Sequence, residues 1–148
     1  MKGIYREIFY YLEGLEDRLG NYQKQIAKRY VETYHDVELH HQFARGELKI
    51  QIDAKNLLNI TNDIANLLHK LTGGKFQSNI QTDDVISVKL SDIQKLLRIV
   101  HNAKINVKQV IESDDNNTVY KNVAYAKSNL YNIIDSIDEI IKRNIQKS

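Results

Sequence analysis

The chain has no proline among its 148 residues, although about seven would be ordinary for this length. Proline breaks or kinks a helix because it lacks an amide hydrogen and its ring clashes with the preceding turn. A chain without proline can therefore form long, uninterrupted helices. The sequence favours such helices wherever the spacing of its apolar residues supports them.

The first third of the chain has the apolar spacing of one long helix. A stripe with intervals of three and four residues is formed by Ile4, Ile8, Leu12, Leu15, Leu19, Tyr22, Ile26 and Tyr30. The stripe keeps its phase through Gly20, and Tyr34, Val37, His41 and Ala44 continue it. This predicts a continuous or merely kinked helix that reaches about residue 45 and is about 60 Å long.

The periodicity changes twice further along the chain. Residues 47–53 and 85–90 alternate apolar and polar side chains, as strands do, and each is followed by a helical pattern, over 54–71 and from Ser91 onward. Residues 75–92 have the pattern of a hairpin with turn residues at Thr82–Asp84, and the two strands could also pair with each other. A last helix is predicted over 118–146. We expect a mainly α fold in one domain, residues 1–148: a helical bundle with a long N-terminal helix and a small β-hairpin element.

Composition excludes several classes of site. The chain has no cysteine, so disulfides, thiolate metal sites and cysteine nucleophiles are absent. The sequence has no glycine-rich nucleotide-binding signature, and we expect no cofactor. No apolar run approaches the roughly 18 residues of a membrane span, and the N-terminus lacks a secretory signal pattern. We expect a cytoplasmic protein with no membrane partner.

Three of the five histidines, His35, His40 and His41, lie close together. On a helix, Asp36 would face His40, and Glu38 would face His41. Zinc or manganese needs three or four ligands, and this spacing supplies only pairs. The sequence therefore predicts a polar helix face near a helix end rather than a metal site.

Arg29 and His35 are six residues apart. This spacing resembles the Arg-x(4–6)-His motif of HEPN-family nucleases, which are small helical domains that usually dimerise and cut RNA. The resemblance implies a composite site in which His35 is a general acid or base and Arg29 stabilises charge on the phosphate. The family usually has a polar residue directly after the arginine, where this chain has Tyr30. An RNase is therefore an alternative rather than the favoured function.

A basic stripe marks the predicted helix that begins at Ser91. Its members recur every three or four residues and no acid interrupts them: Lys95, Arg98, His101, Lys104 and Lys108. Such a stripe could follow a phosphate backbone, and nucleic-acid binding is a second alternative. The overall charge argues against it, because 21 basic residues are nearly balanced by 19 acidic ones and dedicated nucleic-acid binders are usually strongly basic.

Tyrosine is concentrated at the N-terminus, where six of the nine lie in the first 34 residues. Tyrosine is favoured at interfaces because it buries a large area and keeps a polar group. We predict a non-enzymatic protein-binding module that self-associates through its first helix, at Tyr5, Phe9, Leu12, Tyr22 and Ile26. Abundant Ile, Asn and Lys, which have AT-rich codons, suggest a small phage or mobile-element regulator or inhibitor. The sequence leaves the partner unidentified.

Overall fold

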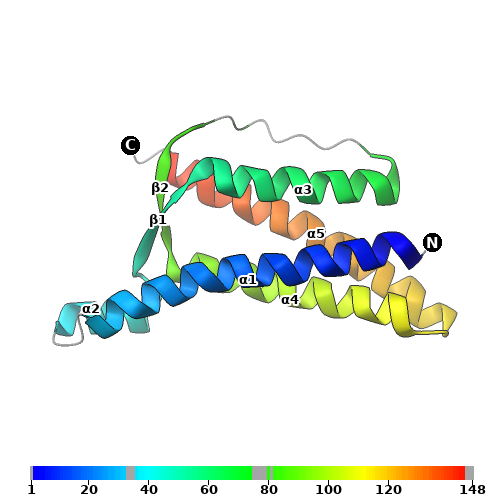
Figure 1. Cartoon of the computed structure of the whole chain (residues 1–148), viewed down its shortest axis with the longest axis horizontal. Coiled ribbons are helices and arrows are strands. Elements are labelled where there is room, and N and C mark those ends of the chain that lie inside the picture. The colour runs from blue at the N-terminus through cyan, green and yellow to red at the C-terminus, as the bar shows by residue number, and fades with distance from the viewer. Residues whose placement is uncertain (1, 33–35, 75–79, 81, 146–148) are drawn as a thin grey trace.

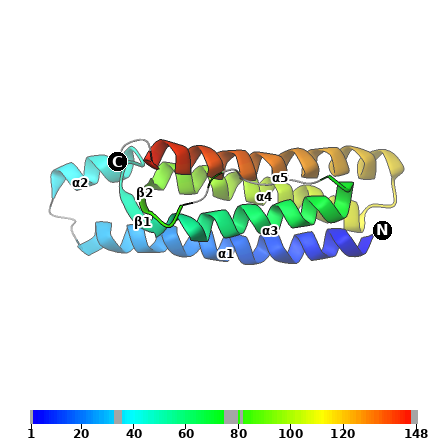
Figure 2. The same cartoon turned by 90° about the horizontal axis from the view of Figure 1, so that it is seen from above.

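The structure is a computed structural model, and it describes residues 2–32, 36–74, 80 and 82–145. In this part of the chain, long helices lie side by side along one axis, and a two-stranded ribbon crosses one end of them (Figure 1; Figure 2). The long helices are α1 (Lys2–Glu32), α3 (Ala54–Thr72), α4 (Leu90–Glu112) and α5 (Asn116–Ile145). The remaining elements are the short helix α2 (Val37–Ala44) and the strands β1 (Lys49–Asp53) and β2 (Val85–Lys89). The predicted helical bundle with a small β element is confirmed.

Helix α1 runs without interruption through Gly20, so the predicted continuity at this glycine is confirmed. It ends at Glu32, and the predicted continuation to residue 45 is wrong. The buried side chains of α1 follow the predicted stripe and include Ile8, Leu12, Leu15, Leu19 and Ile26.

Helix α2 is a separate helix because Asp36 caps its N-terminus. The Asp36 carboxylate accepts hydrogen bonds from the amides of Glu38 and Leu39, at 3.0 and 3.3 Å, and Asp is among the favoured residues at this position. The ring of Phe43 stacks on that of Tyr30 with 4.2 Å between centroids. A capping residue therefore starts a new helix that packs against the end of α1.

The two strands pair with each other in antiparallel orientation. Their buried positions face one another in register: Ile50 opposite Val88 and Ile52 opposite Ile86. The partner of β2 among the described residues is thus β1, and the first half of the hairpin predicted over residues 75–92 is not tested. Residues 75–79 and 81 lie outside the described residues. The alternation in residues 47–53 and 85–90 correctly predicted both strands.

Gly46 lies between α2 and β1, and two features of this position require glycine. Its φ is +70°, in the left-handed region, where a Cβ atom is unfavourable. A Cβ at this position would also lie 3.0 Å from the Cβ of Ser91. The close approach allows the Ser91 amide to donate to the Gly46 carbonyl at 2.9 Å. Gly46 therefore ties the start of α4 to the ribbon.

The ribbon links two layers of helices. β1 leads directly into α3 in one layer, and β2 leads into α4 in the other (Figure 1). Helix α4 packs against both α1 and α5, whereas α3 packs mainly on α5. One continuous apolar core connects these elements. Its largest fully buried side chains include Leu57, Ile60, Ile64 and Leu68 of α3, Ile93 and Leu96 of α4, and Leu130 of α5.

Candidate functional site

An apolar groove opens at the end of the bundle farthest from the ribbon. We call it the end groove. It has a volume of about 460 Å³ and lies between the start of α1, the end of α3, the end of α4 and the first half of α5. Its apolar lining consists of Tyr5, Leu71, Val110, Val119, Tyr120 and Val123, and its polar lining consists of Lys2, Asn116 and Lys127.

The end groove exists because α3 ends before it reaches the first turns of α5, although it covers the rest of that helix. Gly73, with φ +76°, forms a left-handed C-cap in which its amide donates to the His69 carbonyl at 2.8 Å, a common way for a helix to end. Beyond this point, Val119 and Val123 of α5 are only half-buried against the core. The apolar face of α5 therefore extends past the helix that covers the rest of it.

Tyr120 adds an aromatic ring to the groove, although this ring is not part of the buried core. Its side chain is 79% exposed, although it lines the groove. At the floor, burial raises the pKa of the Tyr5 hydroxyl, because the charged form is disfavoured away from water. An exposed aromatic next to a partly covered apolar face is a feature of protein-binding surfaces.

The charges at the groove are positive. Lys2 is held there because its ammonium donates to the Ile111 carbonyl at 3.0 Å, and Lys127 lies on the α5 side. Among the described residues that line the groove, none has a carboxylate. The site therefore combines an apolar floor with a basic rim.

The five residues predicted to form an interface differ in how deeply the structure buries them. Tyr5, Leu12 and Ile26 are buried in the chain's own core, with exposed fractions of 6%, 0% and 1%. Phe9 and Tyr22 are half-buried against that core. Leu12 and Ile26 cannot contact a second chain while the bundle is folded, so the proposed set needs correction. Tyr5 lines the end groove.

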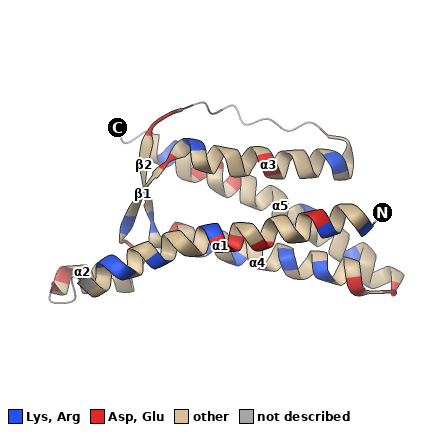
Figure 3. Ribbon diagram, viewed as in Figure 1, with Lys and Arg blue, Asp and Glu red and all other residues tan. Residues whose placement is uncertain are grey.

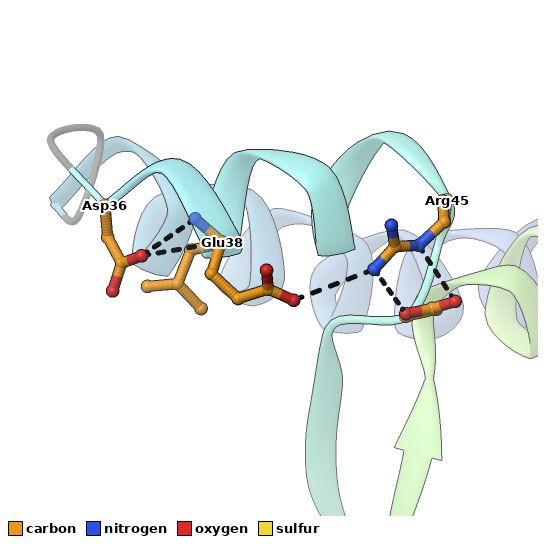
Figure 4. A network of polar contacts seen from close by, with 5 residues as sticks. Asp36, Glu38 and Arg45 are labelled. Atoms are coloured by element: carbon orange, nitrogen blue, oxygen red, sulfur yellow. Dashed lines mark hydrogen bonds and ion pairs between the residues drawn. The ribbon is translucent and has the colours of Figure 1, made fainter.

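The histidine region forms local contacts around α2. His40 Nδ1 lies 2.6 Å from the Tyr30 hydroxyl, within hydrogen-bond distance, while Asp36 caps the helix (Figure 4). Glu38 pairs with Arg45 at 3.8 Å. Within the described residues, no three His, Asp or Glu side chains come close enough to hold a metal ion. His35 lies outside the described residues.

The nuclease-like pair is represented by Arg29 alone in the described part of the chain. Arg29 Nη1 donates to the Lys49 carbonyl at 3.1 Å, which joins α1 to β1. His35 is not among the described residues, so the geometry of the pair stays a prediction. Arg29 also lines a second hollow, beside the ribbon.

The basic stripe lies on α4 as predicted, but an acid from another helix neutralises part of it. Glu16 of α1 lies 3.6 Å from His101 Nδ1 and 3.5 Å from Lys104 Nζ. Lys104 is half-buried, and its ammonium lies 5.5 Å from the centre of the Phe9 ring. The remaining members, Lys95, Arg98 and Lys108, are exposed. Sequence spacing along one helix could not detect Glu16.

Sequence reasoning also missed the end groove, although one signal was present. Tyr120 stands beside the apolar stripe that contains Val119 and Val123, and it widens the apolar face at the start of α5. Such widening indicates a helix face that more than one neighbour covers. The absence of a covering helix here depends on where α3 ends, which spacing within α5 does not specify.

In the described part of the chain, no helix combines the length and the apolarity needed to cross a membrane. Comparisons with protein-family models, curated proteins and solved structures find no match to this chain.

Proposed function

We propose that this chain is a non-enzymatic protein-binding module that receives an acidic, amphipathic helix of a partner in the end groove. The observation that carries the proposal is the combination of an apolar floor, an exposed Tyr120 and a rim that contains Lys2 and Lys127. An amphipathic helix buries its apolar face in such a groove. Acidic residues beside that face would meet the two lysines, which favours association and correct orientation.

The lining of the groove supports binding rather than chemistry. Its described residues supply apolar side chains, two lysines and one asparagine. The exposed ring of Tyr120 can become a buried anchor when a partner covers it, and buried tyrosines are frequent energetic centres of interfaces. This chemistry suits a partner that contributes both apolar contacts and negative charge.

Two alternatives rank below this proposal. Nucleic-acid binding through α4 is weakened because Glu16 engages His101 and Lys104. An RNase using Arg29 and His35 has no further support from the described residues. Self-association through the residues predicted on α1 is disfavoured, because Leu12 and Ile26 are buried in the chain's own core. A second copy of the chain is therefore an outcome to be tested rather than the proposed occupant.

The test uses a designed helix of about sixteen residues with leucines at helical spacing and glutamates elsewhere. Its binding is measured by fluorescence anisotropy against two controls: a peptide of the same composition with scrambled leucine spacing, and a peptide with lysine in place of glutamate. We expect the acidic amphipathic helix to bind more tightly than both. Equal binding of all three, or tightest binding of the lysine peptide, would overturn the proposal.

A matched pair of variants locates the binding surface. Tyr120→Ala should weaken binding about tenfold or more, as loss of a central aromatic does. Tyr125→Ala is the control, because Tyr125 is also exposed on α5, at 56%, but does not line the groove. Equal losses in the two variants would contradict the site. Light scattering of the free protein tests the other occupant, since a dimer that Tyr120→Ala dissociates would show that a second copy covers the groove.

A further inference from the structure

A second hollow, which we call the sheet cleft, lies at the ribbon end of the molecule. It has a volume of about 560 Å³, within the range of small-molecule sites, and lies between the end of α1, α2 and the outer face of the ribbon. Three cations line it, each from a different element: Arg29 of α1, Lys49 of β1 and Lys89 of β2. The basic residues of the ribbon lie at its end nearest α1 (Figure 3).

Lys49 and Lys89 lie next to each other although their like charges repel. Lys49 and Lys89 are direct partners in the antiparallel register, so their side chains extend from the same face of the ribbon. Like charges in directly opposite positions destabilise a sheet. Their convergence on one cleft is therefore better explained by a ligand of opposite charge than by the stability of the ribbon.

The nearest carboxylate in the cleft is already neutralised. Glu47 lines the cleft, but Arg45 holds both of its carboxylate oxygens, with Nε at 3.0 Å from Oε1 and Nη2 at 3.1 Å from Oε2 (Figure 4). Such a two-pronged pair satisfies the charge of the acid locally. Among the described residues of the lining, Lys49 and Lys89 therefore carry positive charge that no other carboxylate of the cleft balances.

The remaining polar groups suit an oxygen-rich anion. Gln42, Gln51 and Ser87 line the same cleft, and Gln51 is opposite Ser87 in the register, one step along the same face from the lysines. Amide and hydroxyl groups donate hydrogen bonds to phosphate oxygens. Arg29 is fixed beside them by its bond to the Lys49 carbonyl at 3.1 Å.

We propose that the sheet cleft binds a small molecule that carries two linked phosphate groups, with Arg29, Lys49 and Lys89 contacting its oxygens. Two adjacent phosphates spread several negative charges over a distance that cations from three separate elements can surround. Lysine supplies a point charge to phosphate, and arginine supplies a planar fork of donors. The proposal is independent of the end groove, because the two linings share no residue.

The test is isothermal titration calorimetry of the intact protein with sodium pyrophosphate, and with orthophosphate and sulfate at equal ionic strength. Pyrophosphate should bind more tightly than either single anion. Adenosine diphosphate then separates two sources of the same chemistry: binding tighter than pyrophosphate would identify a nucleotide, and equal or weaker binding would identify a diphosphate recognised alone. No heat from pyrophosphate up to about 1 mM would overturn the proposal.

Matched lysine variants keep the result specific to the cleft. Lys49→Gln and Lys89→Gln should each lower the affinity for pyrophosphate about tenfold or more, which is the effect of losing one charged hydrogen bond. Lys95→Gln and Arg98→Gln remove the same charge from exposed positions on α4 and should change it less than about twofold. Equal losses in both sets would reduce the binding to general charge attraction and contradict the site. Tighter binding of a single-stranded RNA, lost in the α4 variants, would also contradict it.

Discussion

The end groove and the sheet cleft lie at opposite ends of one bundle, and they differ in what the fold leaves exposed there. At the end groove, α3 stops early and leaves the apolar residues Val119 and Val123 half-covered. At the sheet cleft, a two-stranded ribbon has only one buried face, so Lys49 and Lys89 stand on the other. The first surface results from a missing neighbour, and the second results from strand alternation. A single core thus supports two surfaces, of which the end groove is mainly apolar and the sheet cleft is mainly polar and charged.

The largest effect on stability is expected from changes in the core that supports both the end groove and the sheet cleft. Leu12 and Leu19 are 0% exposed, and Leu12→Ala should lower the free energy of unfolding by about 2–5 kcal/mol. The double change Leu12→Asp, Leu19→Asp should unfold the chain, because two carboxylates would be buried without partners. Urea unfolding measures both. Tyr10→Ala is the control, since Tyr10 is 70% exposed and its loss should change stability by less than about 0.5 kcal/mol.

Self-association through α1, as predicted from the sequence, would instead require the double aspartate variant to give a folded monomer. A folded monomer of unchanged stability would show that Leu12 and Leu19 lie on a surface, and would contradict the core described here.

The next effect concerns the ribbon end alone. The described residues of α2 include no buried side chain, and an isolated helix of eight residues is unstable in water. Asp36→Ala removes its cap and should cost about 1 kcal/mol. Hydrogen exchange should show faster exchange in α2 while α5 keeps its protection. Loss of protection throughout the bundle would mean that α2 is part of the core and not a separate local unit.

A smaller effect of opposite sign tests the lysine pair. Lys89→Gln removes the like charge opposite Lys49 and should raise the free energy of unfolding by about 0.2–1 kcal/mol. The gain should shrink at high salt, because salt screens exposed charges. Thermal unfolding at two ionic strengths measures it. A variant that is less stable than the parent would show that Lys89 stabilises the ribbon, and would remove one argument for a ligand.

The smallest effect is expected at the start of α5, beside the end groove. Asp115 accepts hydrogen bonds from the amide and hydroxyl of Thr118, at 3.1 and 2.6 Å, and these bonds lower the pKa of the Asp115 carboxyl. A lowered pKa in the folded state means that the cap stabilises the helix fully above the unfolded value of about 3.9 and is lost as pH falls through the folded value.

Amide protection at Thr118 and Val119, corrected for the intrinsic exchange rate, should therefore fall in acid below about pH 4. Asp115→Asn is the control, because asparagine caps helices and does not titrate. If that variant loses protection over the same pH range as the parent, another group is responsible.

Much of the architecture could be predicted from sequence because periodicity reports burial directly. The stripe in α1 and the alternation in both strands became buried positions, as at Ile8 and Ile50. The end of α1 could not be predicted from the stripe, because apolar phase continues past residue 32 while the Asp36 cap starts a new helix. Local capping chemistry there overrides the periodic pattern.

The candidate sites depend on contacts between elements, which spacing within one element does not report. Glu16 is far from Lys104 in sequence, yet it lies 3.5 Å from the lysine ammonium. Lys49 and Lys89 meet because β1 and β2 pair across the intervening α3. The predicted interface on α1 needs correction at Leu12 and Ile26 for the same reason, since the elements that pack on α1, chiefly α4, come later in the chain.

The most direct test of two separate surfaces is one set of nitrogen–proton NMR spectra of the labelled protein, first with the acidic designed helix and then with pyrophosphate added. The account predicts that the peptide shifts amides of α5 around Tyr120, that pyrophosphate shifts amides around Lys49 and Lys89, and that neither ligand displaces the other. Shifts of the same amides by both ligands, or release of the peptide by pyrophosphate, would contradict it. Either result would mean that charge attraction at one surface accounts for both ligands.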